Sequence, residues 1–261
     1  MSDDNIVSLD IEGHIATVSI NRPERRNALS IEAANRLHDI WEEIDANSDI
    51  RVAILTSAQC GTFCAGMDLK QAAQIKAEKG VDILSLIRDP FHQRMRRVNV
   101  PIIAAMTGHF AAGGFMLMLN SDIRVGLADT SGGVTEVKRG RGSPWAVPVL
   151  WQLPQPFVME LLLTGDSVPV ERFRELGFVN HVENSPEQVM ERARAIAANI
   201  ASNAPLSVKA AKLSTVRALS LGCEAGLEEA NAIYETVYAS EDAQEGPRAF
   251  SEKREPVWQG R

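Results

Sequence analysis

Short hydrophobic strands followed by amphipathic helices recur along the first part of the chain. Alternating apolar and polar residues predict strands at 6–11 and 14–20, while the continuous apolar run at 52–55 predicts a buried strand. Apolar runs also predict strands at 101–106 and 122–125. Strands that alternate with helices in this way indicate an α/β fold.

Helical periodicity connects these strands and dominates the end of the chain. Ser30 is suited to cap a helix, because its hydroxyl can accept a free backbone amide of the first turn. The apolar face of this helix comprises Ala34, Leu37, Ile40, Trp41 and Ile44. A helix is also predicted over 81–98 despite Pro90, and helices dominate from Glu187 onward, with Pro205 between two of them.

Two apolar features bear on what the chain contacts. Residues 102–119 approach the length of a membrane span, but Gly113 and Gly114 lie among them. We therefore expect a buried strand, a glycine turn and a buried helix there, with no membrane contact. In the helix-rich end, Phe250 and Trp258 are suited to pack either on a partner subunit or on their own domain, and the sequence leaves both open.

Composition places the chain among globular proteins and bears on its partners. The 261 residues are 45% hydrophobic and 23% charged, which excludes a disordered or collagen-like chain. The net charge of −7 argues against nucleic-acid binding, which needs a dense cationic surface. Cys60, Cys64 and Cys223 lack the spacing of a zinc site and are expected to be reduced thiols, and the acidic N-terminus does not resemble a secretory signal. We therefore expect a cytoplasmic protein.

Two glycine-containing turns follow buried strands and are the strongest candidates for chemistry. One spans residues 63–70 and the other residues 108–114. Small residues let the backbone approach a ligand closely, and amides from two such turns can converge on one oxygen atom. If Gly113 begins a helix, its amide is available for this purpose. Such a pair would form an oxyanion hole.

Four ordered sequence blocks resemble motifs of one family and together cover nearly the whole chain. Residues 21–29 read NRPERRNAL, and residues 65–70 read AGMDLK. Residues 101–123 contain PIIAAM, then GG, then DI, and residues 245–258 contain EG followed by AFSEKREPVW. These blocks resemble the corresponding elements of the crotonase, or enoyl-CoA hydratase/isomerase, superfamily.

The resemblance implies both a fold and an assembly. Residues 1–200 are expected to form an α/β, crotonase-like superhelix of β-β-α repeats that binds acyl-CoA. Residues 201–261 are expected to form a C-terminal helical trimerisation region, giving a homotrimer or a hexamer made of two trimers.

The resemblance also implies a chemistry in which two backbone amides hold a thioester carbonyl and stabilise an enolate. The amides fall on Met67 and Gly113 here, and losing one such donor costs about a hundred- to a thousandfold in rate. The resemblance implies no cofactor beyond the coenzyme A part of the substrate, and no metal. The residues that it assigns to coenzyme A, with the two amides, are Arg26, Ala28, Ala65, Met67, Asp68, Leu69, Lys70, Gly113 and, reaching a neighbouring subunit, Lys253.

One of the family's two acid–base glutamates is missing. The family register places one carboxylate at Glu136, whose pKa an apolar surrounding should raise towards neutrality. It places the other at position 116, which is Met116 here and cannot transfer a proton. Asp89, His92 and His109 are possible substitutes, although each is also suited to a capping, surface or core role.

The residues after Glu136 also depart from the family pattern, since Ser143 and Pro144 occupy positions where the family commonly has proline and glycine. Trp145 follows, and with Phe115 and Met116 it would make a bulky apolar wall. We therefore expect a substrate other than simple short-chain crotonyl-CoA.

Together these features predict an enzyme that isomerises or hydrates an enoyl-CoA through a thioester enolate with a single glutamate. Two alternatives remain open at this stage. One is a crotonase-type hydrolase of a thioester or β-diketone, and the other is a catalytically silent acyl-CoA-binding homologue.

Overall fold

A six-stranded sheet forms the centre of the protein. The computed structural model describes residues 6–261. Its strand order is β1-β2-β3-β5-β7-β10, with β1 antiparallel to β2 and the other pairs parallel. The strands are β1 (Val7–Glu12), β2 (Ile15–Ile20), β3 (Val52–Ser57), β5 (Ile102–Met106), β7 (Ile123–Leu127) and β10 (His181–Glu183).

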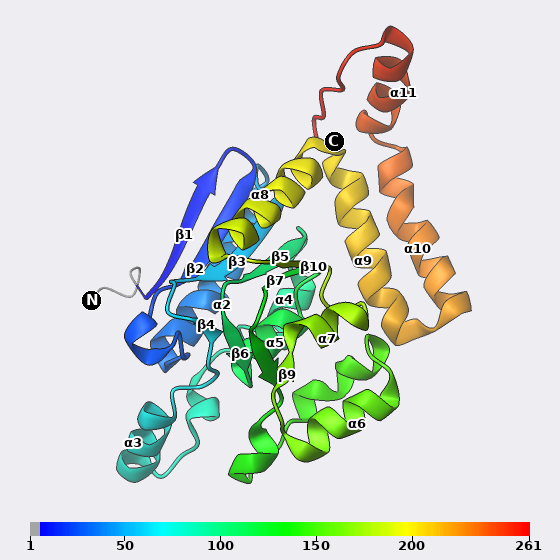
Figure 1. Cartoon of the computed structure of the whole chain (residues 1–261). Coiled ribbons are helices and arrows are strands. Elements are labelled where there is room, and N and C mark those ends of the chain that lie inside the picture. The colour runs from blue at the N-terminus through cyan, green and yellow to red at the C-terminus, as the bar shows by residue number, and fades with distance from the viewer. Residues whose placement is uncertain (1–5) are drawn as a thin grey trace.

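A smaller sheet of order β4-β6-β8-β9 lies beside the first. Its strands are β4 (Thr62–Cys64), β6 (His109–Ala111), β8 (Ser131–Gly133) and β9 (Val168–Pro169). The chain passes from β3 to β4, from β5 to β6 and from β7 to β8, so each repeat gives one strand to each sheet (Figure 1). Helices α3 (Leu69–Lys79) and α5 (Gly113–Leu119) follow the first two of these pairs. This order confirms the predicted α/β fold of β-β-α repeats.

Side-chain alternation in the buried strands divides the core into two parts. In β3, Ala53 and Leu55 face the main core, which also receives the apolar face of α2 (Ile31–Ala46). Val52 and Ile54 point to the other side, where α8 (Pro186–Ser202) covers the sheet. A buried strand with helices on both faces needs apolar residues at consecutive positions, as the sequence of β3 provides.

Helix α2 forms as its sequence predicts. The Ser30 hydroxyl accepts a hydrogen bond from the amide of Ala33, which confirms the cap. All five residues of the predicted apolar face are at most 1% exposed. The indole N–H of the buried Trp41 donates a hydrogen bond to the carbonyl of Pro90 at 3.0 Å, so the one polar group of this side chain has a partner.

The continuous helix predicted over 81–98 is wrong. The structure has a 3₁₀ helix, η2 (Ile83–Leu86), and a separate α4 (His92–Arg97). Pro90 has no amide to donate, and a residue that precedes a proline is disfavoured in helical geometry. The carboxylate of Asp89 instead accepts the amides of Phe91, His92 and Gln93, and so starts α4 afresh.

The remaining helices cover the lower part of the molecule and form its C-terminal extension. They are η1 (Pro23–Arg25), η3 (Glu136–Arg139), η4 (Pro144–Trp151), α6 (Gln155–Thr164), α7 (Val170–Glu175), α9 (Pro205–Leu221), α10 (Cys223–Tyr238) and α11 (Asp242–Glu252). Helices α9, α10 and α11 extend away from the sheets (Figure 1). Lys212 of α9 connects this extension to the core, because its ammonium contacts Asp122 at 2.8 Å and the carbonyl of Val100 at 2.9 Å.

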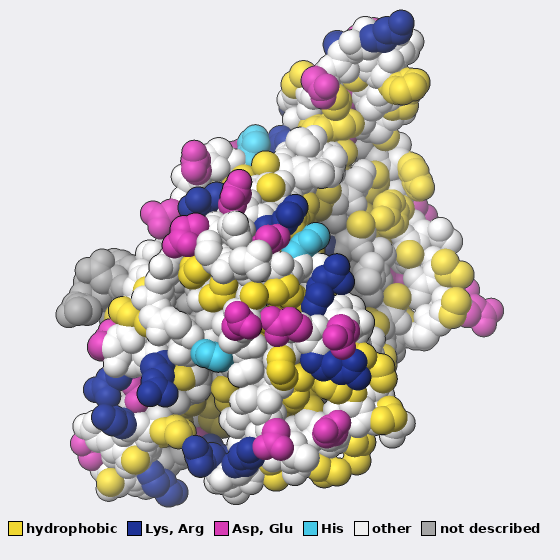
Figure 2. Space-filling view, in the orientation of Figure 1, with side chains coloured by type: hydrophobic (Ala, Val, Ile, Leu, Met, Phe, Trp, Pro, Cys, Tyr) yellow, Lys and Arg dark blue, Asp and Glu magenta, His cyan; other side chains and the backbone are white. Residues whose placement is uncertain are grey.

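Hydrophobic side chains remain exposed over α6 and along the C-terminal helices (Figure 2). The two aromatic residues singled out in the tail behave differently. The Trp258 indole donates to the carbonyl of Ser202, so it packs on its own chain, whereas Phe250 is 87% exposed. No helix within residues 6–261 combines the length and apolar character that crossing a bilayer requires.

Candidate active site

The two glycine turns predicted to carry the chemistry meet each other in the structure. A Cβ atom added to Gly66 would lie 2.9 Å from the Cβ of Ala112 and 3.2 Å from the amide nitrogen of Gly113. A Cβ added to Gly114 would lie 2.2 Å from the carbonyl oxygen of Cys64. Real Cβ atoms do not approach this closely, so glycine at these positions is what allows the turns to touch.

The backbone amide of Met67 points away from Leu29, to which the residues on either side of Met67 are hydrogen-bonded. Leu29 donates to the carbonyl of Gly66 at 2.8 Å and accepts from the amide of Asp68 at 2.9 Å. These two bonds form a parallel bridge between Leu29 and Met67, in which the amide of Met67 faces the opposite side. No acceptor within residues 6–261 bonds to it.

The amide of Gly113 is free for a different reason. Gly113 is the first residue of α5, and the first amides of a helix have no acceptor in their own helix. Ala112 precedes it with φ 49° and ψ −112°, a conformation that costs about 1–3 kcal/mol for a residue with a side chain. Across the described part of the chain, the Gly113 amide makes no hydrogen bond. Two unbonded amides therefore lie on two backbones in direct contact.

Asn27 organises the first turn, a role that the sequence analysis did not assign. Its side chain is completely buried, and its φ is 53°. Its amide group donates to the carbonyls of Ala58 and Thr62, each at 2.8 Å, and its oxygen accepts the amide of Arg22 at 3.0 Å. The asparagine within NRPERRNAL was the available signal, since asparagine tolerates positive φ and bonds to nearby backbone.

Arg22 and Asp68 form a second support beneath the Met67 turn. The Arg22 guanidinium contacts Asp68 at 2.9 Å and also bonds to the carbonyl of Ala28. Asp68 caps α3 by accepting the amides of Lys70 and Gln71. Burial opposes its charge, but these hydrogen bonds outweigh burial and hold the pKa of Asp68 below its usual value. Its carboxylate is thus engaged within the protein rather than offered to a ligand.

Glu136 follows the strand that pairs with the Gly113 turn. The amide of Ala112 donates to the carbonyl of Gly133 at 3.1 Å, and Glu136 begins η3 three residues later. Burial raises the pKa of Glu136 above its ordinary value, against hydrogen bonds from the backbone and from the side chain of Trp145. Its Oε2 is buried and has no hydrogen-bond partner among the described residues. The structure therefore places here a half-buried carboxylate that binds a proton more readily than a solvated one.

Two of the three residues predicted to form an apolar wall, Phe115 and Trp145, contact each other. The ring of Trp145 lies 6.2 Å from that of Phe115, which is completely buried. Met116 is partly buried against the same core and supplies no titratable group. Phe115 is thus part of the core, while Met116 and Trp145 remain partly exposed.

Arg124 holds α5 in place and is a second residue that the sequence analysis missed. The side chain is buried, and it donates to the carbonyls of Met118, Leu119 and Ser121 at the end of this helix. Burial lowers its pKa to about 10, so it remains charged at neutral pH. A cation at the carboxyl end satisfies acceptors that the helix itself leaves unpaired. The sequence does not mark this arginine, because it also donates to the carbonyl of Phe178 and to the side chain of Gln152, which lie in distant segments.

The three possible substitutes for the missing carboxylate have other roles. Asp89 starts α4, and His109 is exposed, with Nδ1 bonded to Ser131. His92 is half-buried beside Asn120, and burial followed by the charge of Arg96 lowers its pKa. None of these contacts links the three side chains to Glu136.

The residues predicted to contact coenzyme A lie partly at the surface of the glycine-turn region. Arg26, Ala65, Leu69 and Lys70 are exposed, whereas Ala28 is 8% exposed. Arg26 carries a positive φ of 51° beside Asn27, which directs this short turn outward. Their surroundings are compatible with an anionic, extended ligand that approaches the Met67 turn from solvent.

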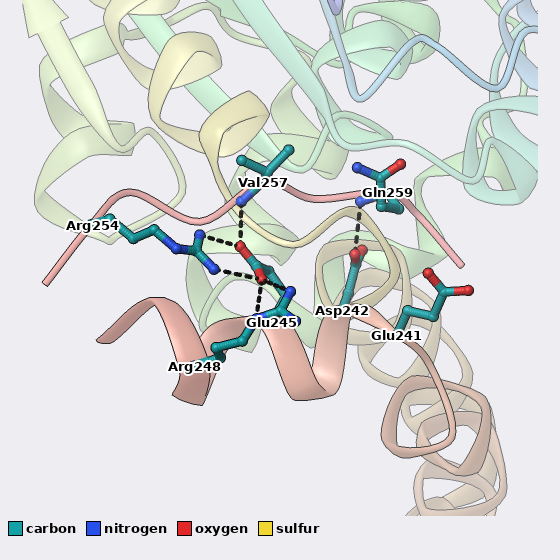
Figure 3. Close-up of a pocket in the computed structure, with 7 residues that line it drawn as sticks. All are labelled: Glu241, Asp242, Glu245, Arg248, Arg254, Val257 and Gln259. Atoms are coloured by element: carbon teal, nitrogen blue, oxygen red, sulfur yellow. Dashed lines mark hydrogen bonds and ion pairs between the residues drawn. The ribbon is translucent and has the colours of Figure 1, made fainter. Parts of the chain in front are cut away.

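Lys253 ends α11, whose side chains form a hydrogen-bond network with the chain end. Glu245 of α11 accepts hydrogen bonds from Arg254, from Arg248 and from the amide of Val257 (Figure 3). Arg254 foremost holds the pKa of Glu245 well below its usual range. Lys253 ends α11 with φ 54° and is exposed, and α11 projects away from the sheets (Figure 1).

Comparisons with known proteins agree with the fold and with the motifs. The family model described as enoyl-CoA hydratase/isomerase matches residues 10–261. An (E)-benzylidenesuccinyl-CoA hydratase of Thauera aromatica is 34% identical, over 97% of this chain and 99% of that protein. The enoyl-CoA hydratase EchA19 of Mycobacterium tuberculosis is 36% identical, over 95% of this chain and 94% of that protein. A crystal structure of enoyl-CoA hydratase from Bacillus anthracis superposes with a TM-score of 0.92 at 31% identity, covering 98% and 100% of the two chains.

Proposed function

The chain belongs to the enoyl-CoA hydratase/isomerase family and is an acyl-CoA enzyme of the crotonase type, and on this premise we propose how its site works. The amides of Met67 and Gly113 hold the thioester carbonyl oxygen of the substrate, and Glu136 is the single group that transfers protons. The observation that carries the proposal is the contact of the two glycine turns, which holds two unbonded amides on adjoining backbones. The half-buried Glu136 follows the strand that pairs with one of these turns.

The two amides lower the barrier by stabilising the negative charge of an enolate. When a proton leaves the carbon next to the thioester, its electron pair moves into the carbonyl, and the charge collects on the oxygen. Donors that are already in position need no reorganisation at that moment, and each contributes about a hundred- to a thousandfold in rate. The rigid supports from Asn27, Arg22 and Arg124 keep this geometry.

One carboxylate is sufficient for a double-bond shift. In its ionised form Glu136 removes the α-proton of a β,γ-enoyl thioester, and the electron pair delocalises into the thioester carbonyl. The protonated carboxyl then returns the proton to the γ-carbon, so the double bond comes to lie between the α- and β-carbons. Atoms and charge balance without any co-reactant. A half-buried carboxyl with a raised pKa is suited to both steps, because its proton affinity lies closer to neutrality.

Hydration by one carboxylate follows a related course. Glu136 takes a proton from water while the water oxygen bonds to the β-carbon, and the enolate then receives that proton at the α-carbon. Met116 removes the second carboxylate that would otherwise help hold the water. This difference favours isomerisation, or hydration of substrates whose own polar groups order the water.

The acyl group that we propose is larger than crotonyl. Trp145 is half-buried and packs on the buried ring of Phe115, and aromatic rings pair well with aromatic or bulky apolar ligands. The similarity to a benzylidenesuccinyl-CoA hydratase is consistent with an aryl-substituted acyl chain. We therefore place aryl enoyl-CoA thioesters first among candidate substrates.

Coenzyme A contacts and assembly complete the proposal. Arg26 and Lys70 are exposed beside the Met67 turn and can meet phosphates, and the exposed Ala65 and Leu69 adjoin them. Ala28 and Asp68 are buried beneath, and Asp68 shapes this surface by capping α3. Residues 201–261 form the oligomerisation region of a homotrimer or hexamer, in which Lys253 reaches the nucleotide bound by a neighbour. The exposed apolar residues of α9, α10 and α11 support this role. The cytoplasmic location stays a prediction.

Deuterium exchange tests the proposed chemistry before the physiological substrate is known. We expect the enzyme in D₂O to incorporate deuterium at the α-carbon of 3-phenylpropanoyl-CoA, as measured by mass spectrometry. Glu136→Gln should abolish exchange while leaving binding of the thioester close to normal, and Glu160→Gln, at an exposed position of α6, is the matched control. Exchange at the wild-type rate in Glu136→Gln would mean that the base lies elsewhere.

Product analysis separates the alternatives. Release of free coenzyme A, detected with a thiol reagent, would indicate a hydrolase. Tight thioester binding with neither exchange nor turnover on a panel of enoyl-CoA thioesters would indicate a silent binding protein.

A further inference from the structure

Cys64, the last residue of β4, contacts both of the turns that carry the candidate oxyanion amides. Its Sγ accepts a hydrogen bond from the amide of Gly66 at 3.4 Å. A Cβ atom added to Gly114 would lie 2.2 Å from the carbonyl oxygen of Cys64 and 3.0 Å from its Cβ. Gly66 directly precedes Met67, and Gly114 directly follows Gly113. One residue therefore adjoins the backbone of both amides.

The Gly66 amide is the one bonded amide of the first turn that depends on a side chain. Ala65 donates to the carbonyl of Arg26 at 3.2 Å, and Asp68 donates to the carbonyl of Leu29 at 2.9 Å. No backbone carbonyl within residues 6–261 accepts the amide of Gly66. The orientation of the peptide group that precedes Gly66 therefore depends on the sulfur two residues earlier.

The direction of the Met67 amide depends on the two peptide groups that meet at Gly66. Leu29 holds the second of them by donating to the carbonyl of Gly66 at 2.8 Å. Gly66 has φ +92° and no side chain, so rotation about its backbone bonds costs little unless both peptides are held. The thiol of Cys64 holds the first peptide. Losing it would let the Met67 amide turn away from that of Gly113.

Burial gives the thiol of Cys64 a fixed chemical state. The residue is completely buried, and burial raises its pKa to about 12, so the thiol is neutral at physiological pH. Sulfur is a weak acceptor, but a buried amide with no acceptor at all is costly. A serine hydroxyl can accept an amide two residues further on in the same way, whereas alanine cannot.

We propose that Cys64 is a positioning residue, whose thiol fixes the Gly66 peptide and thereby the direction of the Met67 amide. Its carbonyl and Cβ lie against Gly114 and keep the first turn aligned with the second, which carries the Gly113 amide. The role consists of hydrogen bonding and packing and includes no covalent step. It rests on the proposed function, because the direction of the two amides matters only if they bind the thioester oxygen.

The first test compares Cys64→Ala with Cys64→Ser. Both substitutions remove the sulfur, so both should lower the free energy of unfolding in urea to a similar extent. Only Cys64→Ala leaves the Gly66 amide without an acceptor, and its rate of deuterium exchange into 3-phenylpropanoyl-CoA at saturation should fall about 5- to 30-fold. Cys64→Ser should stay within about threefold of wild type. The KM should change little in either variant, and Cys223→Ala, at an exposed position, is the matched control.

A second pair of variants repeats the comparison with larger side chains. Valine and threonine have nearly the same shape, and only threonine offers an oxygen atom. Cys64→Thr should therefore exchange deuterium faster than Cys64→Val. This pair decides the question if the cavity left by alanine or serine unfolds the protein.

The outcomes distinguish this inference from the proposed function. Equal exchange rates within the pairs, or rates that follow stability across the four variants, would show that Cys64 only fills space and would overturn the positioning role. Such a result together with an inactive Glu136→Gln leaves the proposed function intact. Full activity in Glu136→Gln would instead overturn the proposed function.

Discussion

Replacing Gly66 by alanine tests the contact on which the candidate site depends. Gly66 has φ +92°, and the added Cβ would lie 2.9 Å from the Cβ of Ala112 and 3.2 Å from the amide nitrogen of Gly113. Neither neighbour is the end of a flexible side chain. Relief therefore requires the two turns to move apart, which separates the amides of Met67 and Gly113.

The magnitude has two parts. Forcing a residue with a side chain into a positive φ costs about 1–2 kcal/mol, and overpacking a tight contact costs about 1–3 kcal/mol more. The free energy of unfolding should therefore fall by roughly 2–5 kcal/mol. Displacing one oxyanion donor should reduce the rate of deuterium exchange at saturating thioester about a hundred- to a thousandfold, and should change KM less.

Gly80→Ala provides a matched control. Gly80 ends α3 with φ +70°, but no heavy atom lies within 4 Å of its added Cβ. It should show the backbone cost alone, about 1–2 kcal/mol in urea unfolding, and near-normal exchange. If Gly66→Ala exchanges deuterium as fast as Gly80→Ala, the contact of the two turns does not hold the donors, and the reasoning fails.

Three further predictions concern the supports of the site. Arg124→Met should lower the free energy of unfolding by at least about 3 kcal/mol, because several buried carbonyls lose their donor; a loss below about 1 kcal/mol in urea unfolding would contradict this. Burial raises the pKa of Glu136 in the folded state above its value of 4.5 in the unfolded chain, so ionising this carboxyl lowers the stability of the fold as the pH rises through these two pKa values. The Tm of Glu136→Gln should therefore increase relative to that of wild type between pH 4 and pH 7. A difference in Tm that stays constant over this range would count against a buried carboxylate. Burial raises the pKa of Cys64 to about 12, so iodoacetamide should label Cys60 and Cys223 in the native protein and spare Cys64, and early labelling of Cys64 in peptide mass spectra would show that the β4 turn opens.

Local features of the fold followed from the sequence because short-range chemistry decides them. Ser30 begins α2 through its own hydroxyl, and the period of the apolar residues fixes which side of α2 is buried. The apolar run of β3 likewise predicts a strand covered on both faces. The motifs around the two glycine turns identified the family, and the comparisons confirm it. The break near Pro90 was missed because helical periodicity outweighed the proline in that prediction.

The arrangement of the candidate site was decided by tertiary structure. Periodicity and motifs marked Gly66 and Gly113 separately, but only the packing of one turn on the other brings their backbones within van der Waals contact. The sequence did not reveal the supporting role of Arg124, because its position also depends on the distant carbonyl of Phe178. The motif marked Asn27, but its acceptors, the carbonyls of Ala58 and Thr62, lie more than 30 residues away. The contact of Trp145 with Phe115 likewise depends on how η4 packs against α5. A residue's own neighbours in sequence determine its helix or strand, whereas the partners of a buried polar group are determined only when distant segments close around it.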